Sequence, residues 1–562
     1  MNDEVKIFAL GGLDEHGKNM YVIEINNDIF VLEAGLKYPD KSSPGIDFII
    51  PNHEYLITNK SRIKAYFISH GHDDQFGALP FIYKQAPAPI YTTKAAAMML
   101  ERFTRRVGVK DVKYEIFTIE PSSQHNIAGH KFTFFQTTHS AMHSFGIALD
   151  TSQGTVVYSG DFIIEYTNSA RYKLDLNSIA KIAEKNVLCL LSESSGAEKA
   201  GYTSPTHRLA PNIVPIFRET KGRIFISLYD QSTYNIEELV QVVINAKRKI
   251  AFYDPNTEEY FRDFAKAGLS LIDERYIISN DDLLRARDQD IVILMLGAGE
   301  KIYEKIIALS NRENPDKKIV LGKDDTFIMA LPAPATLEVI ATEALDSLYT
   351  TGCNVVNITR KLFTNMHAQE EDLRMLLSLL KPKYYIPVKG LYRQQIANAQ
   401  LALHSGLKFS HHNIFLLDNG VSVEFNDGVG RVKMSPLDLI PSGDVLVDGT
   451  GIGDINRGVI EDRQRLSEDG IIIMAIAVNY DERTITAGPD VQMRGFVYVK
   501  DSEQLLKQIR QIFINTVSEA LDARQFDIDG AVKETESRVE KYIFRETRRH
   551  PMILPLIRVI NE

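Results

Sequence analysis

The chain has 562 residues, of which 44% are hydrophobic and 25% are charged. This composition is typical of folded globular proteins and excludes a mostly disordered, collagen-like or coiled-coil chain, while the length requires several domains. The formal net charge is −10, from 64 Lys and Arg against 74 Asp and Glu. That balance argues against a non-specific, histone-like hold on nucleic acid, although a catalytic channel can still be locally positive.

Three features predict a cytoplasmic protein with no membrane association. The longest apolar runs, residues 187–191 and 470–478, are too short to cross a bilayer. The first six residues are polar and lack the apolar core of a signal peptide. The two cysteines, Cys189 and Cys353, form neither a disulfide framework nor a zinc knuckle, which fits a reducing compartment.

The first part of the chain reads as β-rich. Short β-prone runs at residues 5–10, 20–24 and 29–33 are separated by turn-forming Gly, Asn and Asp residues. A strand at 63–69 precedes a His- and Asp-rich loop and a short helix, and two further strands are expected at 131–138 and 155–159.

From about residue 211 the pattern changes to strands alternating with helices. Strands at 223–228, 249–253 and 291–296 and a helix at 235–248 give a βαβ rhythm, which predicts a parallel sheet. A strand at 354–359, a polar loop, a helix at 370–380 and a strand at 384–388 follow. The Gly- and Asp-rich segment 443–458 is predicted to be a linker. Beyond it, strands at 470–478 and 495–499 and helices at 502–521 and 529–544 predict a small α+β domain.

The strongest chemical signal is the run His70-Gly71-His72-Asp73-Asp74-Gln75 at the end of the strand 63–69. Imidazole and carboxylate groups are the ligands that suit zinc or manganese, and the glycine permits a tight turn between the two histidines. Taken alone, the run is equally compatible with a polar surface loop.

Two later residues strengthen the metal interpretation. His139 follows the strand 131–136, and Asp161 follows the strand 155–158. Singly, His139 fits an ordinary loop histidine and Asp161 fits a turn. Three ligand motifs at successive strand ends, in this order, resemble the metallo-β-lactamase fold.

The chain as a whole resembles the ribonuclease J family of bacteria. The resemblance covers almost the entire length and is carried by residues 11–20, 33–40, 45–51, 188–194, 380–388 and 488–499. It implies an α/β architecture: a metallo-β-lactamase αββα sandwich with an inserted β-CASP α/β domain and a small α+β C-terminal domain. The domains are placed at 1–210 and 357–442 for the two parts of the metallo-β-lactamase domain, 211–356 for the β-CASP domain, 443–458 for the linker and 459–562 for the C-terminal domain.

The resemblance also implies a function and a ligand set. The family degrades RNA from the 5′ end, with some endonuclease action, in rRNA maturation and mRNA decay in the cytoplasm. By its pattern, His70, His72 and His139 hold one ion, and Asp161 bridges to a second ion that also rests on Asp74. The family completes that second site with two histidines, and here those positions are occupied by Gln75 and Lys389.

These two replacements predict one divalent ion, Zn²⁺ or Mn²⁺, and weak activity. Glutamine is a poor substitute for imidazole, and a protonated lysine has three donors and no acceptor, so it cannot bind a cation. We expect the Lys389 ammonium to occupy part of the second ion's place and to pair with Asp74 or Asp161. The alternative is that Lys389 points to solvent.

The same pattern assigns the remaining site residues. The expected catalytic residues are Asp74, Glu193, His367 and Lys389. The expected substrate-binding residues are Phe363, Thr364, Asn365, Met366 and His367. The segment 227–235 departs from the family's RNA-contacting loop, which places affinity for a 5′ phosphate in doubt.

Three functions are compatible with these features. The first is a ribonuclease of low activity on single-stranded RNA. The second is a largely non-catalytic partner that binds RNA and assembles with an active ribonuclease J paralogue, in addition to forming homo-oligomers. The third, a small-molecule hydrolase of the β-lactamase type, leaves the inserted and C-terminal domains without a role.

Overall fold

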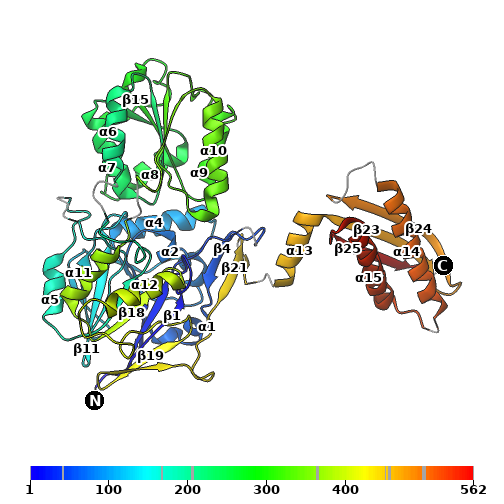
Figure 1. Cartoon of the computed structure of the whole chain (residues 1–562), viewed down its shortest axis with the longest axis horizontal. Coiled ribbons are helices and arrows are strands. Elements are labelled where there is room, and N and C mark those ends of the chain that lie inside the picture. Colours follow the sequence, from blue (N-terminus) through cyan, green and yellow to red (C-terminus); the bar gives the residue numbers. More distant parts are fainter. Residues whose placement is uncertain are drawn as a thin grey trace. The chain divides into compact units, whose positions relative to one another are not determined.

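The computed structural model describes residues 2–40, 43–165, 169–203, 208–362, 366–449, 451–453, 457–495, 502–523 and 525–560 (Figure 1). The chain divides into two compact units. One contains residues 1–38 and 48–445, and the other contains residues 39–47 and 446–562.

The larger unit contains a sandwich of two mixed sheets. The first sheet has the order β20-β19-β1-β2-β3-β5-β6-β7 and the second has the order β18-β12-β11-β10-β9-β8. Strands of the first sheet are β1 (Val5–Gly11), β2 (Met20–Ile25), β3 (Asp28–Leu32), β5 (Ile63–Ile68), β6 (Ile90–Thr92), β7 (Ile116–Thr118), β19 (Ser422–Asn426) and β20 (Val429–Lys433). Strands of the second are β8 (Gln124–Ile127), β9 (His130–Gln136), β10 (Phe145–Thr151), β11 (Gly154–Tyr158), β12 (Val187–Glu193) and β18 (Tyr384–Val388).

The two sheets face each other across one hydrophobic core. Phe67 of the first sheet packs against Phe132 of the second with ring centroids 4.7 Å apart, and both side chains are fully buried. Aromatic rings of this size bury large apolar areas, which is the main stabilising term for such a sandwich.

Helices cover the outer face of each sheet. Leu373 of α11 (Glu370–Leu380), Ile179 of α5 (Leu176–Ala183) and Leu401 of α12 (Tyr392–Leu403) belong to one cluster with the outer side chains of the second sheet. On the first sheet, Tyr55 of α1 (Glu54–Thr58) packs against Phe8 of β1 at 5.1 Å. The short helices α2 (Asp73–Phe76) and α3 (Leu79–Ile82) and the longer α4 (Lys94–Arg106) follow β5 and β6. The predicted helix–sheet–sheet–helix layering is confirmed.

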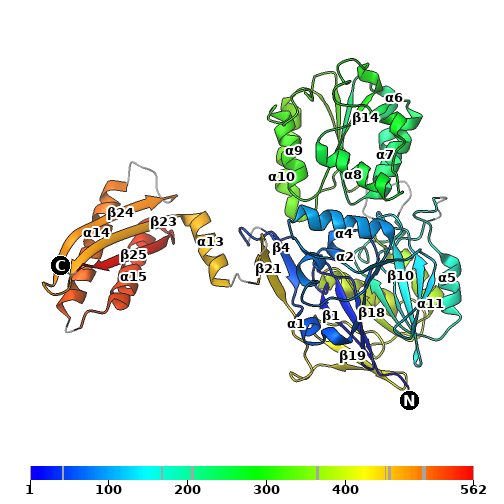
Figure 2. The ribbon, with the colours of Figure 1, turned by 180° about the vertical axis from the view of Figure 1, so that it is seen from behind.

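An inserted α/β domain carries a five-stranded sheet of order β14-β15-β13-β16-β17. All four strand pairs are parallel, as the βαβ rhythm predicts. Helices lie on both faces of the sheet, with α6 and α7 on one face and α9 and α10 on the other (Figures 1 and 2). The elements are α6 (Leu209–Glu219), β13 (Ile224–Tyr229), α7 (Thr233–Asn245), β14 (Lys249–Phe252), α8 (Pro255–Lys266), β15 (Ile291–Gly297), α9 (Lys301–Ser310), β16 (Thr326–Met329), α10 (Glu338–Thr350) and β17 (Asn354–Asn357).

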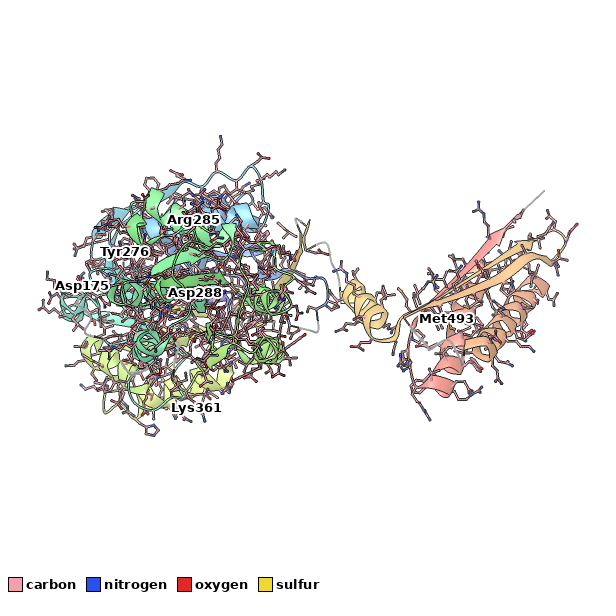
Figure 3. All side chains as sticks on the ribbon, turned by 90° about the horizontal axis from the view of Figure 1, so that it is seen from above. Asp175, Tyr276, Arg285, Asp288, Lys361 and Met493 are labelled. Atoms are coloured by element: carbon pink, nitrogen blue, oxygen red, sulfur yellow. The ribbon has the colours of Figure 1, made fainter. Side chains whose placement is uncertain are left out.

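The outer surface of this insert is polar. Arg285 and Asp288, both labelled in Figure 3, lie on the segment between α8 and β15, and their side chains are 86% and 68% exposed.

The described part of the chain contains no helix with the length and apolar character that crossing a membrane requires.

The smaller unit is an α+β domain. Its sheet has the order β24-β23-β25, built from β23 (Ile471–Asn479), β24 (Thr484–Arg494) and β25 (Met552–Val559). Helices α14 (Ser502–Asp522) and α15 (Ile528–Thr547) pack on one face through Phe513 and Val539. Helix α13 (Arg457–Asp469) precedes β23.

The structure differs from the prediction within the segment 443–458. This segment, predicted to be a linker, contains β21 (Asp444–Asp448) and β22 (Gly451–Ile452), which pair antiparallel. The Val-Leu-Val run within β21 is β-prone, and Val447 is fully buried, so burial outweighs the turn-forming Gly and Asp residues around it. Strand β24 ends at Arg494, and residues 496–499 of the strand predicted at 495–499 lie outside the described residues.

Candidate metal centre and active site

The candidate ligands gather because their strands end at a common edge of the sandwich. His70 lies two residues beyond β5, His139 three residues beyond β9, and Asp161 three residues beyond β11. Most side chains of these strands are buried in the sandwich, and the short polar segment after each strand carries its ligand toward the same pocket. His72 joins them from the start of α2.

Three imidazole nitrogens and one carboxylate oxygen converge in this pocket. Nδ1 of His72 lies 3.1 Å from Nε2 of His70 and 3.4 Å from Nε2 of His139. Oδ2 of Asp161 lies 3.5 Å from the His70 nitrogen and 3.6 Å from the His139 nitrogen. Zinc binds nitrogen at about 2.0–2.1 Å, so the edges of a tetrahedral site are about 3.3–3.4 Å long. The four atoms therefore fit one divalent ion without rearrangement.

The outer nitrogen of each histidine has a partner that turns the inner nitrogen toward the pocket. Nδ1 of His70 contacts Oγ of Ser69 at 2.8 Å. Nε2 of His72 donates to the carbonyl of Gln231 at 3.2 Å, and Nδ1 of His139 donates to the carbonyl of Met366 at 2.6 Å. Such contacts fix the tautomer and the ring orientation of metal-binding histidines.

Burial keeps these three histidines neutral, which is the form that binds metal. Burial lowers the pKa of His70 and of His139 well below the usual range, and it lowers the pKa of His72 as well. A neutral imidazole presents a lone pair to the pocket, whereas an imidazolium does not.

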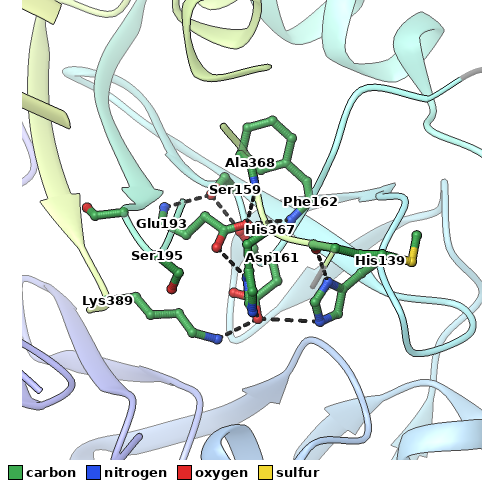
Figure 4. A network of polar contacts seen from close by, with 12 residues as sticks. His139, Ser159, Asp161, Phe162, Glu193, Ser195, His367, Ala368 and Lys389 are labelled. Carbon is green, nitrogen blue, oxygen red and sulfur yellow. Dashed lines mark hydrogen bonds and ion pairs between the residues drawn. The ribbon is translucent and has the colours of Figure 1, made fainter. Parts of the chain in front are cut away.

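Lys389 points into the pocket and not to solvent. Its side chain is 8% exposed, and its ammonium lies 2.5 Å from Oδ2 of Asp161 (Figure 4). The ammonium also lies 2.9 Å from Oδ2 of Asp74. The residue follows β18 and adopts a left-handed backbone with φ of 61°, ahead of Gly390 at φ of 90°. Burial lowers the pKa of Lys389, but Asp161 and Asp74 outweigh it and hold the pKa above its ordinary value, so the group is charged.

Gln75 lies on the same side of the pocket as Lys389. Its Nε2 donates to Oδ2 of Asp161 at 3.3 Å, and its Oε1 is buried without a hydrogen-bond partner among the described residues. The pKa of Asp161 is well below its usual range: burial opposes ionisation, but the positive charges around the carboxylate, Lys389 first and then His367, together outweigh burial. The amide of Gln75 and the ammonium of Lys389 therefore both donate to Asp161. In the family pattern, these two positions are metal-binding histidines.

Glu193 and His367 form a second polar pair beside the three histidines. Nδ1 of His367 lies 2.7 Å from Oε2 of Glu193, and Oε1 of Glu193 accepts hydrogen bonds from the backbone nitrogens of Phe162 and Ala368 (Figure 4). Glu193, His367 and Asp161 are close enough to hold an ion. However, Nδ1 of His367 already lies at hydrogen-bond distance from the Glu193 carboxylate, so an ion pair between these two residues explains their proximity without a metal ion. The His367 side chain is 21% exposed, so its ring can be reached from outside.

The expected substrate-binding loop is described only in part. Phe363, Thr364 and Asn365 lie outside the described residues. Met366 is 3% exposed, so its side chain presents no open surface, and its role in substrate binding stays a prediction. The backbone carbonyl of Met366 accepts the hydrogen bond from Nδ1 of His139 and so orients this ring.

One residue of the site was missed from the sequence. The buried amide of Asn19 donates to the backbone carbonyl of Asp74 at 2.9 Å and to its Oδ2 at 3.0 Å, and so holds this carboxylate toward Lys389. The only available signal was the position of Asn19 inside the segment 11–20, which carries the family resemblance.

The chain is similar to known proteins over almost its whole length. A model of the beta-lactamase superfamily domain matches residues 43–173, and a model of the ribonuclease J C-terminal domain matches residues 458–560. The proteins named Ribonuclease J 2 of Staphylococcus epidermidis (strain RP62A) and Staphylococcus aureus (strain NCTC 8325) are 33% and 32% identical, over 99% of this chain and 98% of theirs. A crystal structure of a protein of unknown function from Enterococcus faecalis V583 covers 75% of this chain and 100% of its own, with 14% identity and a TM-score of 0.53.

Proposed function

This chain belongs to the ribonuclease J family, and we propose that it is a metal-dependent ribonuclease that works at a half-preserved centre. Its substrate is single-stranded RNA, degraded from the 5′ end with some endonuclease action, in rRNA maturation and mRNA decay in the cytoplasm. The observation that carries the proposal is the convergence of His70, His72, His139 and Asp161 on one point.

We propose one ion, Zn²⁺ or Mn²⁺, in the first site. An ion bound there supplies Lewis acidity at the scissile phosphate and lowers the pKa of a water molecule. The three neutral imidazoles and the ionised Asp161 would hold that ion. The contact of His70 with Ser69, and the hydrogen bonds that His72 and His139 donate to the carbonyls of Gln231 and Met366, orient the ligands.

Lys389 takes over part of the electrostatic task of a second ion. Its ammonium neutralises Asp161 and Asp74, and one of its three N–H groups remains for a phosphate oxygen. A single positive charge that is already shared by two carboxylates offsets less negative charge on the phosphate than a divalent ion does. Activity below that of a two-metal centre follows from this difference.

His367 is the proton donor to the leaving oxygen in this proposal. Burial lowers its pKa, but the Glu193 carboxylate outweighs burial, and the pKa of His367 is raised. Glu193 also fixes the ring, because its second oxygen is held by two backbone N–H groups. A partly exposed imidazolium of this kind can give its proton to a substrate oxygen.

The test is the decay of a 5′-monophosphorylated single-stranded RNA by the purified full-length chain with Mn²⁺ or Zn²⁺. We expect slow decay that disappears in His72→Ala and in Asp161→Ala. His411→Ala removes an exposed histidine and serves as the matched control. Decay that continues unchanged in both pocket variants contradicts the proposal. Comparison with a 5′-triphosphate RNA and with a circular RNA separates exonuclease from endonuclease action.

A second role is favoured by the surface of the smaller unit. Leu554 and Leu556 of β25 are 42% and 50% exposed, and they lie in register with Ile473 and Ala475 of β23, on the sheet face opposite the helices. Together with the lost ligands, this apolar face supports a partner that forms homo-oligomers and assembles with an active ribonuclease J paralogue. We expect Leu554→Asp with Leu556→Asp, or deletion of residues 459–562, to abolish co-purification. Assembly that survives the deletion contradicts this role.

A further inference from the structure

The inserted domain reaches into the metal pocket through one short loop. Gln231, two residues beyond β13, accepts the hydrogen bond from Nε2 of His72 through its backbone carbonyl. Thr233 accepts from the backbone nitrogen of Met142 at 2.8 Å, and the backbone nitrogen of Tyr234 donates to the carbonyl of Ser140 at 2.9 Å. Residues 231–234, here called the docking loop, therefore touch both the His72 loop and the loop that carries His139.

A second group of contacts holds the same insert against helix α4. Arg102 and Arg105 both pair with Asp263 of α8, at 3.2 Å and 2.8 Å. Arg102 also donates to the carbonyl of Asn256 at 3.0 Å and lies over the ring of Tyr260. Asp263 is only 12% exposed, so these ion pairs are partly desolvated and stabilise docking more than a surface pair does. None of these residues is a metal ligand.

We propose that metal binding and docking of the insert are thermodynamically linked, with Gln231 as a positioning residue for the ligand His72. The inference rests on the proposed metal site. With the insert docked, the Gln231 carbonyl keeps the proton of His72 on Nε2 and leaves the lone pair of Nδ1 to the ion.

The linkage works in both directions. An imidazole whose one nitrogen binds a cation becomes a stronger donor at the other nitrogen, so an ion at His72 strengthens the hydrogen bond to the insert. Equilibrium coupling is reciprocal, so an insert that docks less firmly weakens the binding of the ion by the same factor. An RNA that displaces the docking loop would then also loosen the ion.

The experiment measures Zn²⁺ affinity of the full-length chain by competition with a fluorescent zinc chelator. The test variants are Arg102→Ala with Arg105→Ala, which weakens docking at α4, and Thr233→Val, which removes one hydroxyl of the docking loop and keeps the side-chain shape. The matched control is Arg262→Ala, which breaks an ion pair to Glu258 within α8. We expect zinc affinity to fall about 3- to 10-fold in the test variants and to stay unchanged in the control.

The reciprocal effect is read by hydrogen–deuterium exchange. In the wild-type chain, zinc should slow exchange of peptides that cover residues 229–245. In His72→Ala the remaining ligands can still hold zinc, but the slowing over 229–245 should disappear, which a merely stabilising effect of zinc would not predict.

Two results overturn the inference. One is an unchanged zinc affinity in variants whose insert exchanges faster. The other is an equal loss of affinity in the Arg262→Ala control. A wild-type chain that binds no zinc at all would instead overturn the proposed metal site, so the two failures are distinguishable.

Discussion

The ammonium of Lys389 lies 2.5 Å from Oδ2 of Asp161, the same oxygen that faces His70 and His139 at 3.5 and 3.6 Å. The same carboxylate oxygen thus faces two parts of the pocket. One part is the group of histidines that can bind a metal ion, and the other is the Lys389 ammonium, which is itself a cation. An ammonium that is covalently part of the chain cannot be exchanged or removed by a chelator. The pocket therefore keeps this positive charge when all metal ions have been removed.

Replacing Lys389 by Met should destabilise the protein strongly when no metal is present. Asp161 is left buried without its counter-charge, a loss of about 3–5 kcal/mol for broken buried pairs. The measurement is the melting temperature in EDTA and after addition of Zn²⁺, which we expect to rescue the variant more than the wild type. Lys185→Met, which breaks the half-exposed pair with Asp150, is the control and should change little. Equal effects of the two substitutions would count against the role given to Lys389.

Restoring two histidines should create the second metal site. In Gln75→His with Lys389→His, we expect bound metal to rise from one ion to two per chain, measured by mass spectrometry of the dialysed protein. The rate of RNA decay should rise with it, because two ions share the charge of the phosphate. Lys389→His alone is the control. An increase in metal without an increase in rate would show that another departure, such as the segment 227–235, limits the reaction.

Removing His367 should lower the rate without removing the ion. His367→Ala deletes the proposed proton donor, and we expect a loss of about 10²- to 10⁴-fold in the rate of RNA decay. Its Nδ1 pairs with Glu193 at 2.7 Å, lies 3.8 Å from Oδ2 of Asp161 and is not one of the four proposed ligand atoms, so metal content should be unchanged. The two measurements must be made on the same preparation. Loss of the ion in this variant would reassign His367 as a ligand.

Glu33, which is not one of the proposed metal ligands, gives the stability of the protein a pH dependence. The side chain is fully buried, its Oε2 accepts from the backbone nitrogen of Ser69 at 3.1 Å, and its Oε1 has no hydrogen-bond partner among the described residues. Burial raises the pKa of Glu33 to about 8, against 4.5 for the free side chain. The folded protein therefore binds this proton more tightly than the unfolded chain does, and stability falls as the pH rises from about 4.5 to about 8.

The substitution Glu33→Gln should remove this dependence. Relative to the glutamine variant, the wild type should lose about 4 kcal/mol of stability between the two ends of that pH range. Melting temperatures of both proteins at pH 5, 6, 7 and 8 check the prediction. Parallel curves for the two proteins would show that the pKa of Glu33 is not raised in the folded chain.

The sequence by itself determined which residues bear the chemistry and where their strands end. His70, His139 and Asp161 each lie two or three residues beyond the end of a strand, and the change from a strand to a short polar segment can be recognised from neighbouring residues in the sequence. The parallel sheet of the insert was predictable for the same reason, since its βαβ rhythm repeats over neighbouring residues. The strand β21 was missed, because one buried valine outweighs the Gly and Asp residues that surround it.

Only the tertiary structure decided how the site is connected. The pairing of Glu193 with His367, the two carboxylates around Lys389 and the carbonyl of Gln231 behind His72 each join segments that are far apart in the chain. The direction of a side chain depends on which loops the packed sheets bring together. A backbone carbonyl such as that of Gln231 is present in every residue, so the residue type does not show which carbonyl will accept a hydrogen bond. The sequence therefore predicted that the Lys389 ammonium lies beside the metal ligands, and the tertiary structure shows its distances to Asp161 and Asp74.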